Sequence, residues 1–211
     1  MHLLDEVFYV ILNKSMVTQL FIDGENFLFK IEDEITQQGI LKNKIDSTHV
    51  DLRKLIQMVL PNEHIDTIVF YSARLQMHKD TAKKSQELIL KQRILKTHLE
   101  KQGVHFILAG HVRPQIIQLN GKSKTIFKEK GVDVRIAVDL VSLSCDKKID
   151  RAIICSSDSD LQPAIAEVRK RNVEVVYLGF ENSPNKGLTY TTNRTVLIRN
   201  SEVLQTVPVS K

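Results

Sequence analysis

The chain of 211 residues lacks the features that mark several large classes of protein. Its two cysteines, Cys145 and Cys155, have neither a CxxC spacing nor companion histidines. A cysteine zinc site is therefore excluded, and two reduced thiols on buried elements are expected. No apolar run reaches the roughly 18–20 residues of a membrane span. Asp5 and Glu6 stand where a signal peptide carries positive charge. We expect a soluble, cytoplasmic protein without a membrane partner.

The motifs of several nucleotide and zinc enzymes are also missing. The seven histidines show no HExxH or paired ligand spacing, so none is assigned to catalysis. The chain has no GxxxxGK(S/T) phosphate loop and no GxGxxG after a strand, which disfavours an NTPase and a dinucleotide enzyme.

The composition is that of an ordinary globular protein, with only 8 glycines and 5 prolines. Its length suits one domain with a single core. We expect this domain over residues 16–200, because Met16 directly precedes the first clear strand, with 1–15 as an N-terminal appendage and 201–211 as a C-terminal tail. The formal net charge of +5 permits a polyanionic partner. The oligomeric state stays open, a homo-oligomer included.

Short apolar, β-branched runs alternate along the chain with stretches of helical periodicity. Near-continuous apolar strands separated by helices indicate a mostly parallel sheet covered on both faces. The sequence therefore predicts a three-layer α/β/α fold with about five to six strands. Strands are expected at 17–23, 65–72, 104–109, 149–156 and 173–179, and helices at 26–38, 48–60, 79–102, 134–144 and 160–171.

Two further segments are expected to join this fold. Asn120 followed by Gly121 is a hairpin signal, so residues 112–130 are predicted to form a β-ribbon that leaves the main sheet. One more strand, 195–199, is expected at a sheet edge.

Aspartates stand where an open α/β sheet forms its sites, outside the carboxyl ends of the strands. Asp23 ends the first predicted strand, with Asn26 three residues later. Asp158 and Asp160 follow the fourth strand, and Asp133 comes just before a helix. Four carboxylates from three distant segments are therefore expected to meet at one edge of the sheet.

Clustered carboxylates point to a divalent cation. Two unit charges ~4 Å apart repel by ~4 kcal/mol at an effective dielectric near 20, so four of them together are costly without one. Mg²⁺ and Mn²⁺ prefer carboxylate oxygens, and such ions activate water and stabilise charge when a phosphodiester is hydrolysed. The pattern thus predicts a metal-dependent hydrolase acting on phosphodiester bonds.

Each aspartate also has a purely structural interpretation. Asp133 and Asp160 precede helices, where aspartate is a favoured N-cap. Asp23 and Asp158 could be ordinary turn residues. Independent turn residues would not all fall at strand ends, so the joint pattern favours a site. Asp139 is left outside it, because it lies about 240° around the helix from Asp133.

Three sequence blocks carry a resemblance to a known family. DGEN after the first strand, KGVDVRIAVDL in the middle and SSDSDL after the fourth strand resemble, in this order, the signature blocks of the NYN domain family of PIN-like nucleases. The likeness covers about residues 17–179, with Ser157 at a position where many members have glycine. It implies a central parallel sheet with a metal-binding acidic pocket, and Mg²⁺- or Mn²⁺-dependent endoribonuclease activity on RNA.

The resemblance also assigns roles by position. Asp23, Asp133 and Asp158 match the family's core acidic residues, which would bind the metal. Asp160 matches the second aspartate of the last block, as a metal ligand or close helper. Asn26 matches the asparagine that positions substrate or a metal-bound water. These five residues form the expected catalytic set.

Basic residues near the aspartates indicate a path for RNA. Phosphate contacts give affinity without sequence recognition. We expect them from Arg74, just past the second strand, and from four lysines on the ribbon that leads to Asp133, namely Lys122, Lys124, Lys128 and Lys130. The alternative is helix 79–102, through Lys84, Lys91 and Lys96.

Two other functions fit the sequence less well. A catalytically weak or inactive RNA- or protein-binding regulator on the same fold would have no need of the full acidic set. A phosphohydrolase that forms an aspartyl phosphate needs a second aspartate two residues after the nucleophile. This chain has Glu25 at that position, so the ribonuclease is preferred.

Overall fold

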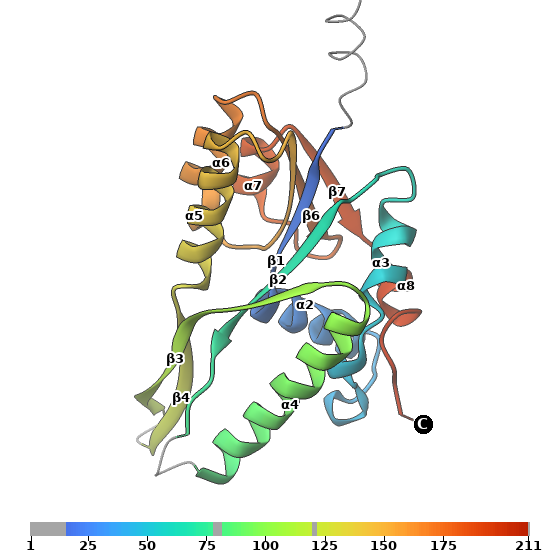
Figure 1. The fold of residues 1–211 in the computed structure, drawn as a ribbon. Helices are drawn as coiled ribbons and strands as arrows, with labels where there is room; N and C mark the ends of the chain where they lie inside the picture. The colour runs from blue at the N-terminus through green and yellow to red at the C-terminus, as the bar shows by residue number, and fades with distance from the viewer. Residues whose placement is uncertain (1–15, 78–81, 120–121, 211) are drawn as a thin grey trace, which may run out of the picture.

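A single sheet of seven strands runs through the molecule, in the order β4-β3-β2-β1-β5-β6-β7 (Figure 1). The computed structural model describes residues 16–77, 82–119 and 122–210, with the backbone alone for 113–117, 119 and 122–128. Neighbouring strands are parallel except β3 and β4, which confirms the predicted mostly parallel α/β fold. The strands are β1 (Thr18–Asp23), β2 (Thr67–Arg74), β3 (His105–Leu119), β4 (Lys122–Lys130), β5 (Arg151–Cys155), β6 (Glu174–Phe180) and β7 (Arg194–Ile198).

Helices cover both faces of this sheet (Figure 1). One face carries α2 (Gly24–Gln37), α3 (Leu52–Val59), α4 (Ala82–Lys101) and α8 (Asn200–Leu204). The other carries α5 (Val132–Cys145), α6 (Gln162–Arg169) and α7 (Lys186–Thr191). The described residues also form the short 3-10 helices η1 (Lys42–Lys44), η2 (Ser47–His49) and η4 (Ser159–Leu161). No helix in the described part of the chain is both long and apolar enough to cross a bilayer.

The core divides into two layers because strand side chains alternate between the faces of a sheet. In β1, Leu20 and Ile22 pack in the layer under α2, whereas Phe21 belongs to the layer under α5. The segment expected as a C-terminal tail packs on the first layer, where Val203 and Val207 are buried.

The sheet has seven strands where five to six were expected, because the predicted ribbon is hydrogen-bonded into it. The first half of β3 pairs with β2 up to His111, and the second half pairs with β4 from His111 to Leu119. The ribbon therefore extends the sheet at one edge, beyond β2 (Figure 1). The strand expected at 195–199 is found as β7 at the opposite edge.

Gly110 brings the returning end of the ribbon against the sheet. Its φ of +63° lies in the left-handed region, and a side chain there would place Cβ 2.1 Å from the carbonyl oxygen of Lys130. Only glycine allows this approach. The contact holds the end of β4 and the start of α5 beside the carboxyl ends of the central strands.

The amino ends of the strands are held by paired charges. Glu63 accepts from Arg151 at 2.5 Å and from Arg194 at 2.5 Å, and Arg151 also donates to Glu174 at 2.6 Å. Asp66 accepts from the backbone N–H of Thr18 at 2.8 Å. These carboxylates thus join the starts of several strands to one another.

Both cysteines are free thiols. Cys155 is buried at the end of β5, as expected, but Cys145 is exposed because it is the last residue of α5.

Candidate active site

Asp23 is fixed at the junction of β1 and α2. It is the last residue of the strand and the N-cap of the helix, where its Oδ1 accepts from the backbone N–H of Asn26 at 3.2 Å. Its Oδ2 accepts from the Ser156 hydroxyl at 3.2 Å. The next residue, Gly24, has no room for a side chain, because an added Cβ would lie 2.2 Å from the ring of Phe70. The side chain is almost fully buried, so its carboxylate has a fixed position.

The loop after β5 folds around its own aspartate. Asp158 is the N-cap of η4, with Oδ1 accepting from the backbone N–H of Asp160 at 2.9 Å. The backbone N–H of Asp158 in turn donates to the Ser156 hydroxyl at 3.1 Å. Ser156 therefore links Asp23 and Asp158 through one hydroxyl group.

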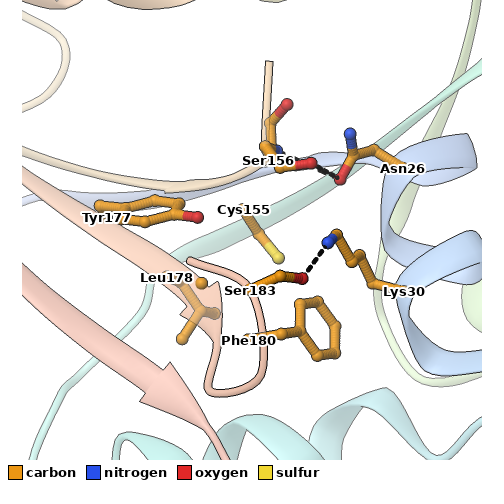
Figure 2. Close-up of a pocket in the computed structure, with 10 residues that line it drawn as sticks. Asn26, Lys30, Cys155, Ser156, Tyr177, Leu178, Phe180 and Ser183 are labelled. Carbon is orange, nitrogen blue, oxygen red and sulfur yellow. Dashed lines mark hydrogen bonds between the residues drawn. The ribbon is translucent and has the colours of Figure 1, made fainter. Parts of the chain in front are cut away.

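Asn26 connects helix α2 to this loop. Its Oδ1 accepts from the backbone N–H of Ser157 at 3.1 Å and from the Ser157 hydroxyl at 2.9 Å. From the other side, Asn185 donates to the carbonyl of Ser157 at 2.7 Å. Figure 2 shows Asn26 turned toward the loop, with Lys30, one turn further along α2, reaching Ser183. The hydroxyl of Ser157 thus adds a hydrogen bond to the site.

Asp133 does not cap its helix. Helix α5 begins at Val132, earlier than predicted, and its N-cap is Gly131 with φ +95° and no side-chain hydrogen bond. Asp133 lies in the first turn with its carboxylate free of a capping role. Asp160 is not a cap either, because it lies inside η4 and the N-cap of the next helix, α6, is Leu161.

Three of the predicted aspartates converge. Asp133, Asp158 and Asp160 each offer a carboxylate oxygen within 4.8 Å of the other two. Asp23 lines the same open pocket, of about 830 Å³, but does not belong to this closest group. Asp160, expected as a metal ligand or close helper, lies inside the group.

Two further carboxyl groups, which were not predicted as part of the site, line the same pocket. Glu25 follows Asp23 by two residues, and Glu129 stands near the end of β4. The charge of Glu25 contributes to the raised pKa of Glu129, so the two carboxyl groups lie near each other. The only local sign of Glu25 was its place within DGEN, and nothing local indicated Glu129, because the return of the ribbon brings it to the pocket.

Burial and mutual repulsion raise pKa values in this pocket. Burial, and then the charges of Asp158 and Glu25, raise the pKa of Asp23 to about 6 against the lowering effect of two hydrogen bonds. The pKa of Glu129 lies well above its ordinary value, through burial first and then the charges of Glu25 and Asp23. Among the residues whose side chains are described, no lysine or arginine forms an ion pair with any of the six carboxylates.

The basic residues expected to guide RNA differ in their position relative to the pocket and in whether their side chains are described. Lys130 is exposed and lines the acidic pocket. Lys122, Lys124 and Lys128 lie on β4, but their side chains are outside the described part of the chain. Arg74 is exposed at the end of β2 and is not among the residues that line the pocket.

Asp139 and two lysines of α4 have partners outside the pocket. Asp139 accepts from Arg135 at 2.8 Å and from the Tyr71 hydroxyl at 3.0 Å, and Tyr71 itself is buried in the core. On α4, Lys91 and Lys96 form ion pairs with glutamates of the same helix. Such pairs are typical of a solvated helix face.

The comparisons with known proteins agree with this architecture. The NYN domain model matches residues 17–198, most of the chain. A crystal structure of a protein of unknown function from Vibrio parahaemolyticus is similar in fold, with a TM-score of 0.50 at 16% identity over 88% of this chain and 94% of that chain. A search of curated proteins gave no match. The chain is therefore a member of the NYN domain family, with the PIN-like nuclease fold of that family.

Proposed function

We propose that this protein is a metal-dependent endoribonuclease that hydrolyses RNA phosphodiester bonds at the acidic pocket. One observation carries the proposal: Asp133, Asp158 and Asp160 bring carboxylate oxygens within 4.8 Å of one another, at the carboxyl ends of parallel strands. Membership of a nuclease-fold family supports the same activity. The compartment we propose is the cytoplasm.

The donor set fits a hard divalent cation, Mg²⁺ or Mn²⁺. All the candidate ligand atoms are carboxylate oxygens, with no thiol or imidazole among them. Asp133, Asp158 and Asp160 would hold the ion, with Asp23 on the same pocket wall. Bound there, the ion would activate water and offset charge on the phosphoryl and leaving oxygens.

The chain's own residues would hold this arrangement and the substrate. Asn26 fixes the loop that carries Asp158 through its two bonds to Ser157. Its proposed role is therefore to position the ligands, in place of the direct contact with water or substrate that the resemblance implies. Lys130 lines the pocket, where it would contact an RNA phosphate.

Further phosphate contacts are proposed along the ribbon and at the end of β2. They would come from Lys122, Lys124 and Lys128 on β4 and from Arg74. A ribbon of lysines that ends at the acidic pocket would lead the RNA backbone to the ion.

Incubation of metal-free protein with labelled RNA and Mg²⁺ or Mn²⁺, with and without a chelator, tests the proposal. Asp158→Asn keeps the oxygen that caps η4 but removes a negative charge, so we expect cleavage to fall by about 100-fold or more while the fold is retained. Asp146→Asn, at the far end of α5, is the matched control and keeps wild-type activity.

Two results would contradict the proposal. The first is cleavage that persists in chelator or in Asp158→Asn. The second is the lack of cleavage with either ion by protein that binds RNA, which would favour a binding regulator on the same fold.

A further inference from the structure

Phe29 stands exposed at the acidic pocket. It is 62% exposed, while Phe27 and Ile31 on the same helix are buried in the core. Single exposed apolar side chains are common and need no function. Phe29 differs because it lines the pocket formed by the carboxylates. It lies three residues after Asn26 and four after Glu25, so the three side chains share one face of α2.

A second exposed apolar residue lines the pocket from the opposite layer of the fold. Val134, on α5, is 60% exposed and follows Asp133 directly. Helices α2 and α5 cover opposite faces of the sheet (Figure 1). One exposed aromatic ring and one exposed aliphatic side chain therefore line the pocket together with its carboxyl groups. Such a surface suits a ligand with both a charged part and a flat apolar part.

We propose that Phe29 stacks against one unpaired nucleobase beside the scissile phosphate, which makes single-stranded RNA the substrate at that point. The inference rests on the proposed function, because the carboxylates and their cation would bind the phosphate to which this base is attached. Aromatic side chains bind bases by stacking, and stacking needs a base that is free of its own neighbours in a duplex.

A nucleotide suits the position better than an apolar protein partner. A protein segment that covered Phe29 would also have to cover a pocket lined by six acidic side chains, none of which forms an ion pair with a lysine or arginine whose side chain is described. Desolvation of such charges is unfavourable. A nucleotide brings a phosphate that the cation and Lys130 attract, and its base then lies within reach of the ring.

Steady-state cleavage of single-stranded RNA by Phe29 variants gives the first test. We expect Phe29→Ala and Phe29→Leu to raise KM by about tenfold with little change in kcat. The Phe29→Trp variant, which keeps an aromatic ring, should have a KM close to that of the wild type. The leucine variant keeps apolar area but loses the ring, which separates stacking from simple hydrophobic contact. Tyr190→Ala is the control, because Tyr190 is exposed on α7 and does not line the pocket.

An RNA with one abasic nucleotide beside the cleaved bond locates the stacked base. The kcat/KM of the wild type should fall on this RNA by about the same factor as Phe29→Ala lowers kcat/KM on intact RNA. Phe29→Ala should lose no more, because a missing base and a missing ring remove the same interaction. If the two losses multiply at every position, Phe29 does not stack on a base.

Fluorescence gives a readout that does not depend on cleavage. The chain has no tryptophan, so the indole introduced by Phe29→Trp reports from this position alone. We expect single-stranded RNA to quench the fluorescence of this variant strongly in Mg²⁺, and the same strand in a duplex to quench it far less. The Tyr190→Trp variant should respond to neither.

The two proposals fail in different ways. Cleavage that is unaffected by Phe29→Ala, with no quenching of the Phe29→Trp variant, overturns the stacking role and leaves the ribonuclease. Quenching by single-stranded RNA without any cleavage overturns the ribonuclease and leaves the stacking site. A shift of Phe29→Ala to a smaller oligomer, with RNA affinity unchanged, would instead assign this surface to a second copy of the chain.

Discussion

Carboxylates have different surroundings at the two ends of the central strands. At the amino end, Glu63 and Glu174 form ion pairs with arginines, and Asp66 accepts from the backbone of β1. At the carboxyl end, six carboxylates line one pocket, and no described lysine or arginine pairs with any of them. The same residue types thus have opposite surroundings at the two ends of one sheet.

This difference separates stability from function. Paired carboxylates at the amino end tie strands together and contribute to folding, whereas unpaired ones at the carboxyl end repel one another and reduce stability. Groups whose local arrangement is unfavourable in the absence of a ligand are a feature of functional sites. The comparison therefore predicts that substitutions at the two ends change stability with opposite sign.

The largest effect on stability is expected at the amino end. Glu63→Gln weakens two ion pairs of a largely buried carboxylate, with Arg151 and Arg194. We expect the free energy of unfolding to fall by about 2 kcal/mol, measured by urea denaturation, with cleavage unchanged at a temperature where the variant is folded. A Glu63→Gln variant as stable as the wild type would contradict a stabilising role for the ion pairs at the amino end.

A smaller gain is expected at the carboxyl end. Asp160→Asn removes one charge from the closest group of carboxylates and no capping bond. Without divalent cations, we expect the free energy of unfolding to rise by about 0.5 kcal/mol, because the side chain is exposed and its repulsion is screened. The gain should shrink in 0.5 M salt. A loss of stability at low salt would show that these charges do not repel.

The smallest effect is expected at an acidic residue outside both ends. Glu34 is buried on α2, where it accepts from Asn182, and burial, with the nearby Asp33 and Glu181, raises its pKa against the opposing effect of Lys30. A raised carboxyl pKa means that stability falls as pH rises from the ordinary to the raised value. Glu34→Gln should therefore raise the thermal midpoint slightly at pH 8 and leave it nearly unchanged near pH 4. An equal shift at both pH values would contradict this.

Local patterns were enough to predict much of the fold and part of the site. Asp23 ends one apolar strand and Asp158 lies three residues after another, so their place at the carboxyl edge follows from the strands themselves. Glu129 could not be predicted in this way, because its position depends on the close contact between Gly110 and Lys130 far along the chain. Asp133 was open to interpretation as a cap until the structure showed that α5 begins earlier, at Val132.

The number of strands was underestimated for a similar reason. The hairpin signal at residues 120–121 located the ribbon correctly, but it could not show that β3 runs without a break from the parallel sheet into the ribbon. Hydrogen bonding between β3 and two different partners is a property of the assembled sheet and leaves no periodicity in the sequence.

The response of the thermal midpoint to Mg²⁺ or Mn²⁺ tests the central claim most directly. A cation that binds only the folded protein stabilises it by ~2.7 kcal/mol at a hundredfold excess over Kd. We predict that the metal raises the thermal midpoints of the wild type and of Glu63→Gln by the same amount, although the two proteins start from different midpoints. In Asp133→Asn and Asp158→Asn, most of this rise should be lost. A full metal-induced gain in both aspartate variants, or no gain in the wild type, would show that the carboxyl end is not a cation site.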